Sequence, residues 1–213
     1  MQYLLGSLLF CIMLTSCKGG DSDVVADTED TAGVSYPPPP LFEIAERLES
    51  TSPSLNANKF SEAGSKREEA FEFFLIEDQV KPFLPYLIYN TDSSFAADPF
   101  SYNYLFNTRS GSKRVDEAGP DFEIGLIDVK QQKRSRIWFT GPAAYVTDVF
   151  WKNKNEIVVI GFEQISPDNG KPFAHIINIA SGETRMYEYS DTLKMLQLDF
   201  LKETLAKKAN VNY

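Results

Sequence analysis

The side chains that most often perform catalysis are scarce in this chain of 213 residues. It has one histidine, His175, within the segment FAHIINIA, and two cysteines, Cys11 and Cys17. A Ser-His-Asp triad would have to use His175, but no G-x-S-x-G sequence precedes it. A zinc site would need further ligands, and there is no second histidine. We therefore expect His175 to be a packed or solvent-facing strand residue, and we expect neither a metal site nor a cofactor.

Two short motifs look like parts of catalytic or ion-binding sites. SGSK at 110–113 matches the S-x-x-K of serine β-lactamases, in which the lysine helps to activate the serine. It lies in the polar stretch NTRSGSKRVDEAG, without companion S-D-N and K-T-G motifs. PDNG at 167–170 is rich in oxygen ligands but lacks the spacing and final glutamate of a calcium loop. We expect a loop and a hairpin turn respectively, and we assign no catalytic or ligand-binding residue.

Acidic and aromatic residues are far more abundant. The chain has 30 acidic residues, 16 phenylalanines, 10 tyrosines and two tryptophans, Trp138 and Trp151. Paired carboxylates could hydrolyse a glycan, whereas aromatic rings stack on sugars or anchor protein interfaces. A net charge of −9 argues against a nucleic-acid partner, which needs basic patches. The basic segment KQQKRSR at 130–136 is expected to be a solvated hairpin turn.

The sequence before Cys17 indicates where the protein is located. The segment from Leu4 to Leu14 is apolar apart from Gly6 and Ser7, and it is shorter than the roughly 20 residues of a transmembrane helix. This length is typical of the apolar region of a signal peptide. The residues that follow it, Leu14-Thr15-Ser16-Cys17, resemble the lipobox of bacterial lipoproteins.

The lipobox resemblance implies cleavage between Ser16 and Cys17 and attachment of acyl chains to Cys17. Stable anchoring to a membrane takes two or more such chains. The mature chain would have no thiol left for a disulfide, because Cys11 leaves with the signal peptide. The alternative is an ordinary buried cysteine in an apolar N-terminal helix.

The residues after Cys17 bear on sorting within the cell envelope. Lys18 stands where an aspartate would favour the inner membrane, which resembles sorting to the outer membrane. The segment CKGGDSD loosely resembles a signal for display on the cell surface. The periplasmic face of the outer membrane and the cell surface both remain open.

A tether and a single domain are expected after the signal peptide at residues 1–16. Residues 17–40 are small and acidic and end in PPPP, which favours a stiff polyproline II spacer. They are expected to hold the domain away from the membrane, with a partner-binding acidic tail as the alternative. Residues 41–213 fit one globular β-rich domain.

Helices are expected at both ends of this domain. An apolar stripe at helical spacing predicts a first helix over 41–48. A capping box at Ser65 and Glu68 predicts a second helix over 65–81. A third is predicted over 191–207, where acidic residues at the start and lysines at the end suit the helix dipole.

Strands are expected between the helices, where β-branched and aromatic segments alternate with turn sequences. Six are predicted, at 122–129, 136–140, 144–151, 156–165, 173–180 and 184–189. The continuously apolar run from Ile157 to Ile160 predicts a central strand. An earlier hairpin is predicted to pair 83–90 with 101–108. The expected fold is mainly β (α+β), an antiparallel β-meander in a blade-like open sheet with two N-terminal helices and one C-terminal helix packed on it.

Residues 141–190 resemble one blade of a WD40-like or TolB-like β-propeller. The matching positions are Val146, Val149 and Trp151 before a turn, the strand at 157–160, and Ile179 before Ser181-Gly182-Glu183. A closed propeller needs at least about four four-stranded blades, and the chain has no room for them. We therefore expect an open sheet.

Two functions of different classes are compatible with these features. The first is a membrane-anchored lipoprotein of the bacterial cell envelope whose domain binds an envelope protein or a glycan without catalysis. The alternative is an envelope hydrolase that uses Asp/Glu acid-base chemistry on a glycan. A structural or assembly accessory without any ligand is a third and weaker hypothesis.

A substitution of Cys17 tests the anchor. We expect Cys17→Ala to abolish labelling by a palmitate analogue and to release the protein from the membrane fraction, because no acyl chain can then be attached. Metabolic labelling and cell fractionation measure the two effects. An unchanged membrane-bound fraction would refute lipidation as the anchor.

Overall fold

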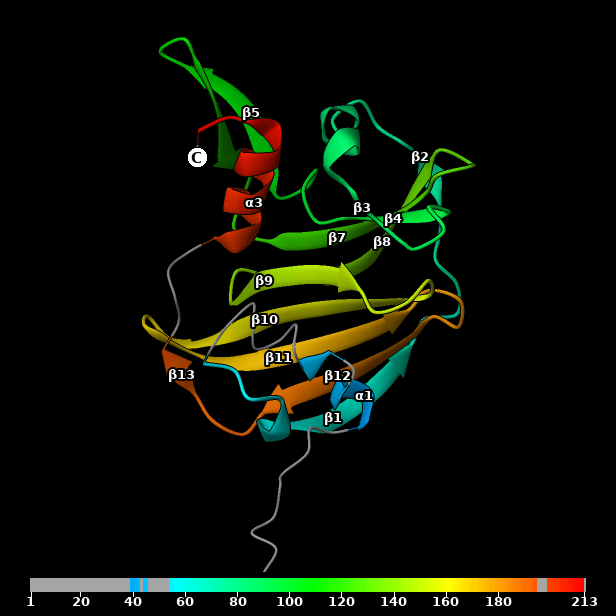
Figure 1. Cartoon of the computed structure of the whole chain (residues 1–213), viewed down its shortest axis with the longest axis vertical. Coiled ribbons are helices and arrows are strands. Elements are labelled where there is room, and N and C mark those ends of the chain that lie inside the picture. Colours follow the sequence, from blue (N-terminus) through cyan, green and yellow to red (C-terminus); the bar gives the residue numbers. More distant parts are fainter. Residues whose placement is uncertain (1–38, 43, 46–53, 195–198, 213) are drawn as a thin grey trace, which may run out of the picture. The chain divides into compact units, whose positions relative to one another are not determined.

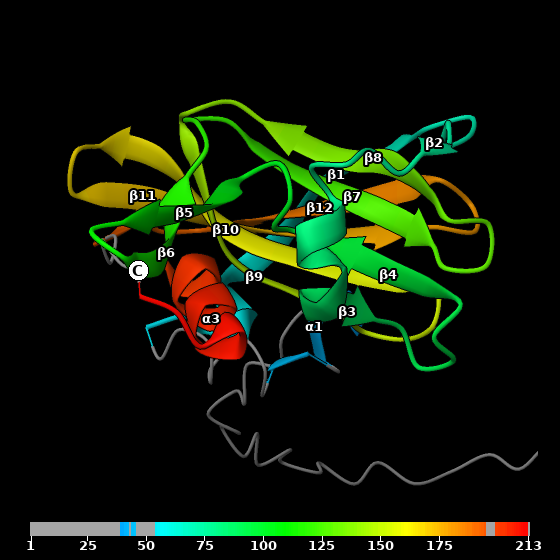
Figure 2. The same cartoon turned by 90° about the horizontal axis from the view of Figure 1, so that it is seen from above.

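The computed structural model describes residues 39–42, 44–45, 54–194 and 199–212. The expected signal peptide, the Ser16–Cys17 cleavage site and nearly all of the expected tether lie outside these residues. Two antiparallel sheets pack against each other within them (Figures 1 and 2). No helix in these ranges is long and apolar enough to cross a membrane.

The larger sheet has six antiparallel strands in the order β1-β12-β11-β10-β9, with β13 paired to β11. Their bounds are Phe60–Arg67 for β1, Ala144–Trp151 for β9, Glu156–Ser166 for β10, Asn169–Asn178 for β11, Glu183–Tyr189 for β12 and Leu193–Lys194 for β13. Strands β9 to β12 form a meander, whereas β1 joins β12 from a distant part of the chain.

The smaller sheet has five strands in the order β2-β8-β7-β4-β3. Their bounds are Phe74–Leu75 for β2, Ile88–Tyr89 for β3, Phe95–Asp98 for β4, Phe122–Asp128 for β7 and Lys133–Thr140 for β8. A separate hairpin consists of β5 (Tyr104–Arg109) and β6 (Ser112–Glu117). It lies beside the C-terminal helix in both views (Figures 1 and 2).

Short helices complete the domain. They are α1 (Pro39–Phe42), the 3-10 helices η1 (Ala57–Lys59) and η2 (Lys81–Tyr86), and α3 (Phe200–Ala209). Helix α3 begins at the N-cap Asp199, whose carboxylate accepts a hydrogen bond from the backbone N–H of Lys202 at 2.9 Å. It ends at Asn210, which adopts the left-handed conformation typical of a helix C-terminus.

The larger sheet is buried on both faces. Ile157 and Val159 of β10 lie in the core between the two sheets. Val158 and Ile160 lie in a second core, which the N-terminal residues around Leu41 cover. A third, smaller core lies on the outer face of the smaller sheet, where η2 and its flanking residues pack. Strand β10 is thus an interior strand, paired with β9 and β11, which agrees with the prediction from its apolar run that it does not lie at an edge.

The mainly β, antiparallel open fold with a C-terminal helix is confirmed. All six predicted strands are present, as β7 to β12. The segment that resembles a propeller blade forms the meander β9 to β12, and both sheets are open rather than closed into a barrel.

The predicted helix over 65–81 is wrong. Residues 60–67 form strand β1, because pairing with β12 overrides the local capping-box pattern. The chain then crosses from one sheet to the other, with Phe71 and Phe73 packed on the core. Phe74 and Leu75 form the short strand β2 instead of the buried side of a helix, and they are 65% and 75% exposed.

Two other boundaries also differ from the predictions. The C-terminal helix begins at Phe200 instead of 191, because Leu193–Lys194 pair with β11 as β13. The predicted pairing of 83–90 with 101–108 is wrong, because β3 pairs with β4 and β5 pairs with β6. In both hairpins the strands pair with the partner that is nearer along the chain, since closing a short loop costs less entropy than closing a long one.

Gly161 offers a test of the packing between strands. A Cβ at this position would lie 2.3 Å from the carbonyl oxygen of Tyr145 and 2.6 Å from Cζ of Phe173. We expect Gly161→Ala to lower the free energy of unfolding by about 1–3 kcal/mol, as overpacked cores do. Urea denaturation measures the change. Gly119→Ala is the control, because no atom lies within 4 Å of its Cβ position, and an equal loss in both variants would contradict the prediction.

Candidate functional site

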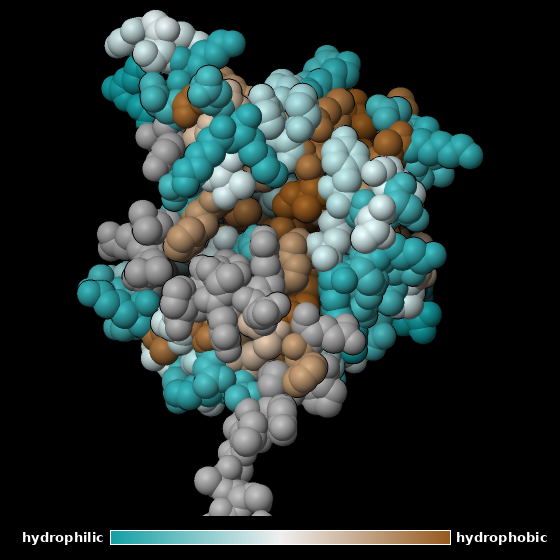
Figure 3. Space-filling view, in the orientation of Figure 1, coloured by the Kyte–Doolittle hydropathy of each residue, from teal (hydrophilic) through white to brown (hydrophobic). Residues whose placement is uncertain are grey.

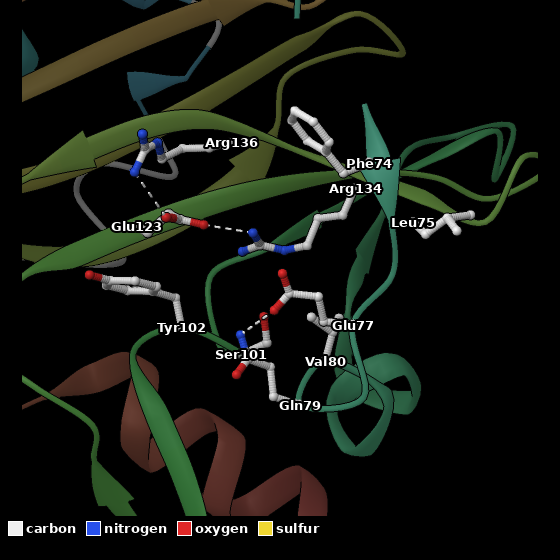
Figure 4. A pocket seen from close by; sticks show the side chains of 10 residues that line it. All are labelled: Phe74, Leu75, Glu77, Gln79, Val80, Ser101, Tyr102, Glu123, Arg134 and Arg136. Carbon is white, nitrogen blue, oxygen red and sulfur yellow. Dashed lines mark hydrogen bonds and ion pairs between the residues drawn. The ribbon is translucent and has the colours of Figure 1, made fainter. Parts of the chain in front are cut away.

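A buried arginine organises the outer face of the smaller sheet. Arg134 on β8 donates from Nε to Asp98 at 3.0 Å and from Nη1 to Glu123 at 2.6 Å. The side chain of Asp98 is 0% exposed, that of Glu123 is 7% exposed and that of Arg134 is 16% exposed. The more exposed Arg136 approaches the second oxygen of Glu123 at 3.6 Å (Figure 4). We refer to these four residues as the arginine cluster.

Strand register and one glycine bring the cluster together. Asp98, Gly125 and Arg136 stand in one row across β4, β7 and β8, so their side-chain positions share a face. A Cβ at Gly125 would lie 2.5 Å from the guanidinium group of Arg134. The guanidinium therefore occupies space that any other residue at position 125 would fill, and from there it reaches both carboxylates.

Backbone hydrogen bonds fix the turn beside the cluster. Oδ1 of Asp98 accepts from the backbone N–H of Ser101 at 3.0 Å, and its Oδ2 accepts from the Ser101 hydroxyl. The Asn103 side chain donates to the carbonyl oxygen of Glu123 and accepts from its N–H, both at 2.8 Å. These bonds hold the turn against β7 and present Tyr102 at the surface.

The arginine cluster is electrically balanced. Burial disfavours the charged form of Arg134, but Asp98 and Glu123 outweigh this effect and raise its pKa. Two carboxylates face two guanidinium groups, so the net charge of the cluster is zero. One donor, Nη2 of Arg134, is buried without a hydrogen-bond partner in the part of the chain that the structure describes. Such an unpaired group costs about 1–3 kcal/mol.

A groove of about 310 Å³, the arginine groove, opens beside the cluster. Glu77, Gln79 and Ser101 add polar groups to it, and Figure 4 shows the Arg134 guanidinium between Glu123 and Glu77. Phe74 and Tyr102 supply aromatic walls.

Exposed aromatic side chains surround the groove. The Tyr102 ring meets the 46% exposed Phe139 edge-on, with centroids 6.3 Å apart, and Arg136 lies 5.3 Å from the Phe139 ring. Apolar surface gathers over the region of β2 and η2 (Figure 3). The groove thus combines planar polar groups with exposed rings, a combination that favours ligand binding.

A second hollow, the end cavity, lies where β5, β6, β7 and β9 meet the N-terminus of α3, and it measures about 530 Å³. Asp199 accepts a hydrogen bond from the Tyr104 hydroxyl there at 2.7 Å. Burial raises the pKa of the Asp199 carboxyl and also that of the Tyr104 hydroxyl. Glu117 at the rim pairs with Lys202 at 3.1 Å.

The sequence predicts that His175 is a packed or solvent-facing strand residue, and the structure shows it in strand β11, packed against Trp138. Its Nδ1 accepts a hydrogen bond from Nε1 of Trp138 at 2.9 Å, which links β11 of the larger sheet to β8 of the smaller sheet. Burial lowers the pKa of His175 to about 4. In the described ranges, no group of three or more His, Cys, Asp or Glu side chains is arranged to hold a metal ion.

The other residues singled out in the sequence do not assemble into a site. SGSK forms the tight turn of the β5–β6 hairpin instead of a loop, with Ser110 and Gly111 at φ 52° and 81°. PDNG forms the β10–β11 turn, as predicted. Ser16 and Cys17 lie outside the described residues.

The expected solvated turn at 130–136 needs a correction. Only its first residues form the turn, and Lys133 to Arg136 belong to β8. Sequence reasoning therefore missed Arg134. The spacing of these residues could have identified it. Glu123 and Gly125 lie two residues apart on one predicted strand, and Arg134 and Arg136 lie two residues apart at the start of the next, so each pair faces the same side of the sheet.

No known protein family, curated protein or solved structure matches this chain. A functional assignment therefore depends on the chemistry of the arginine groove, the end cavity and the N-terminal motif.

The His175–Trp138 hydrogen bond predicts a loss of stability in acid. The pKa of His175 is near 4 in the fold and 6.5 in the unfolded chain, so its contribution is complete above pH 6.5 and is lost as the pH falls toward 4. The loss should reach about 2–3 kcal/mol by pH 4.5. Urea unfolding at pH 7.5 and 4.5 measures it.

Carboxylates also titrate in this range, so a matched variant isolates the histidine. His175→Asn keeps an acceptor close to the position of Nδ1 but cannot be protonated, and it should show a smaller loss between the two pH values. An equal pH dependence in the two proteins would contradict the prediction.

Proposed function

We propose that this protein is a lipoprotein of the bacterial cell envelope, held at the outer membrane by acyl chains on Cys17, whose domain binds a glycan in the arginine groove. The resemblance of Leu14-Thr15-Ser16-Cys17 to a lipobox supports the anchor. The observation that carries the binding role is the pairing of a charge-balanced set of planar polar groups with exposed aromatic rings.

Charge balance favours a neutral polar ligand. The arginine cluster has no net charge, so neither a strong anion nor a strong cation gains much from it. The groove nevertheless offers donors on Arg134 and Arg136 and acceptors on Glu77 and Glu123. Sugar hydroxyls both donate and accept hydrogen bonds, and the apolar face of a sugar ring suits Phe74 or Tyr102.

The same hydrogen bonds argue against catalysis in this groove. Asp98 is fully buried and accepts from two backbone N–H groups, a hydroxyl and Arg134. Glu123 is held between Arg134 and Arg136. A glycan hydrolase needs one carboxyl group that can give up a proton and a second that can attack or activate water. The oxygens of Asp98 and Glu123 are already engaged by arginine and other donors, so neither carboxylate is free to act on a substrate.

The alternative, an envelope hydrolase acting on a glycan, would use the end cavity. The observation that favours it is the raised pKa of Asp199, which helps a carboxyl group to retain a proton. However, Asp199 already caps α3 and accepts from Tyr104. Hydrolysis predicts release of reducing ends that Asp199→Asn abolishes, whereas binding alone predicts no turnover.

Replacement of Tyr102 tests glycan binding. Peptidoglycan fragments, lipopolysaccharide and neutral α- and β-glucans serve as probes of the purified full chain in non-ionic detergent. We expect saturable binding of at least one of these glycans, and we expect Tyr102→Ala to weaken it about fivefold to tenfold because a stacking ring is lost. Calorimetry measures the affinities.

The matched control is Tyr89→Ala, which removes a similarly exposed tyrosine from β3, at the opposite edge of the same sheet. It should leave binding unchanged. Equal loss in both variants, or no binding of any probe, would refute the glycan proposal. In that case in-cell cross-linking that captures one envelope protein in stoichiometric amount would identify a protein ligand instead.

A further inference from the structure

The end cavity has a different chemistry from the arginine groove. Its walls are largely apolar, and Phe122, Val146, Phe162 and the half-exposed Tyr145 contribute to them. Three carboxylates, on Glu117, Asp121 and Asp199, also line it, and none of the described residues that line it is a lysine, arginine or histidine. A volume of about 530 Å³ is within the usual range for sites that enclose a small molecule.

Two of these carboxylates have at least one oxygen that accepts no hydrogen bond from the described residues. Asp121 forms no ion pair with any residue that the structure describes, and it comes from the loop before β7. Asp199 uses Oδ1 for both the Tyr104 hydroxyl and the Lys202 N–H, while its Oδ2 receives no hydrogen bond from the described residues. Glu117, by contrast, is already paired with Lys202.

We infer that the end cavity binds a small organic cation, an ammonium group attached to an apolar or aromatic body. The ammonium group would donate to Asp121 and to Oδ2 of Asp199, and the body would lie against Tyr145 and Phe122. An ammonium has three donors and no acceptor, which matches the carboxylate oxygens of Asp121 and Asp199 that accept no hydrogen bond from the described residues. The chain's net charge of −9 further raises the local concentration of cations.

Burial of Asp199 is consistent with this ligand. Desolvation raises the pKa of its carboxyl, so the empty cavity disfavours the anion, and a bound ammonium would restore it. This second site goes beyond the proposed glycan binding and does not depend on it, because none of the groove residues lines the end cavity.

Phenethylamine and 2-phenylethanol form a matched pair of probes, since they differ in the charged group and share the aromatic body. Calorimetry on the purified full chain at pH 7.5 should show one saturable site for the amine and at least tenfold weaker binding of the alcohol. Equal affinities, or no saturable binding of the amine, would overturn the inference. This comparison uses the unmodified protein, so it does not depend on how any variant folds.

Substitutions then locate the site. Asp121→Asn, in an exposed loop, should weaken amine binding about tenfold, and Tyr145→Ala should weaken it severalfold. Glu69→Gln removes an exposed acid elsewhere and should change nothing, which separates the local contact from the effect of net charge. Tyr102→Ala should also leave amine binding intact. Loss of binding in Glu69→Gln equal to that in Asp121→Asn would overturn the inference.

Discussion

The fold depends on the burial of strand β10 on both of its faces. Successive residues from Ile157 to Ile160 point alternately into two different cores, and all four have no exposed surface. A sheet with two apolar faces needs a cover on each side. The smaller sheet covers one face, and the N-terminal residues around Leu41 and Leu55 cover the other. The other face of the smaller sheet points away from this core, and η2 covers only part of it. The arginine groove lies on this outer face.

The two hollows differ in the way their charges are compensated. In the arginine groove, each buried carboxylate has a guanidinium partner, and removal of Arg134 would leave Asp98 and Glu123 buried and unpaired. Loss of one partner of a buried pair costs about 3–5 kcal/mol, so Arg134 is as much a structural residue as a ligand-facing one. In the end cavity, Asp121 has no such partner among the described residues, and the hydrogen bonds to the Asp199 carboxylate come from a hydroxyl and a backbone N–H. Arginine side chains therefore compensate the buried carboxylates of the groove, whereas Lys202 pairs with Glu117 alone among the described carboxylates of the cavity.

Local patterns in the sequence predict the part of the fold in which strands pair with their neighbours along the chain. Strands β7 and β8 follow this rule in the smaller sheet and strands β9 to β12 follow it in the larger sheet, and turn sequences such as PDNG separate them. The predicted helix over 65–81 fails because β1 pairs with β12, more than a hundred residues away, and a capping-box pattern carries no information about that partner. The buried position of Arg134 was not predicted for a related reason. A basic residue near a turn is usually solvated, and only the register of three strands shows that Gly125 leaves space for its side chain.

Both hollows lie next to places where regular strand pairing is interrupted. The register of β7 and β8 shifts between Ile124 and Gly125, beside the arginine cluster. The register of β9 and β10 shifts between Ile160 and Gly161, one residue before Phe162 of the end cavity. A bulge twists its strand and redirects nearby side chains, so it can open a hollow without breaking the sheet. Each shift occurs at a glycine whose missing Cβ allows another group to approach closely, a side chain at Gly125 and a backbone carbonyl at Gly161. The same two glycines therefore allow tight packing and shape the surfaces available to ligands.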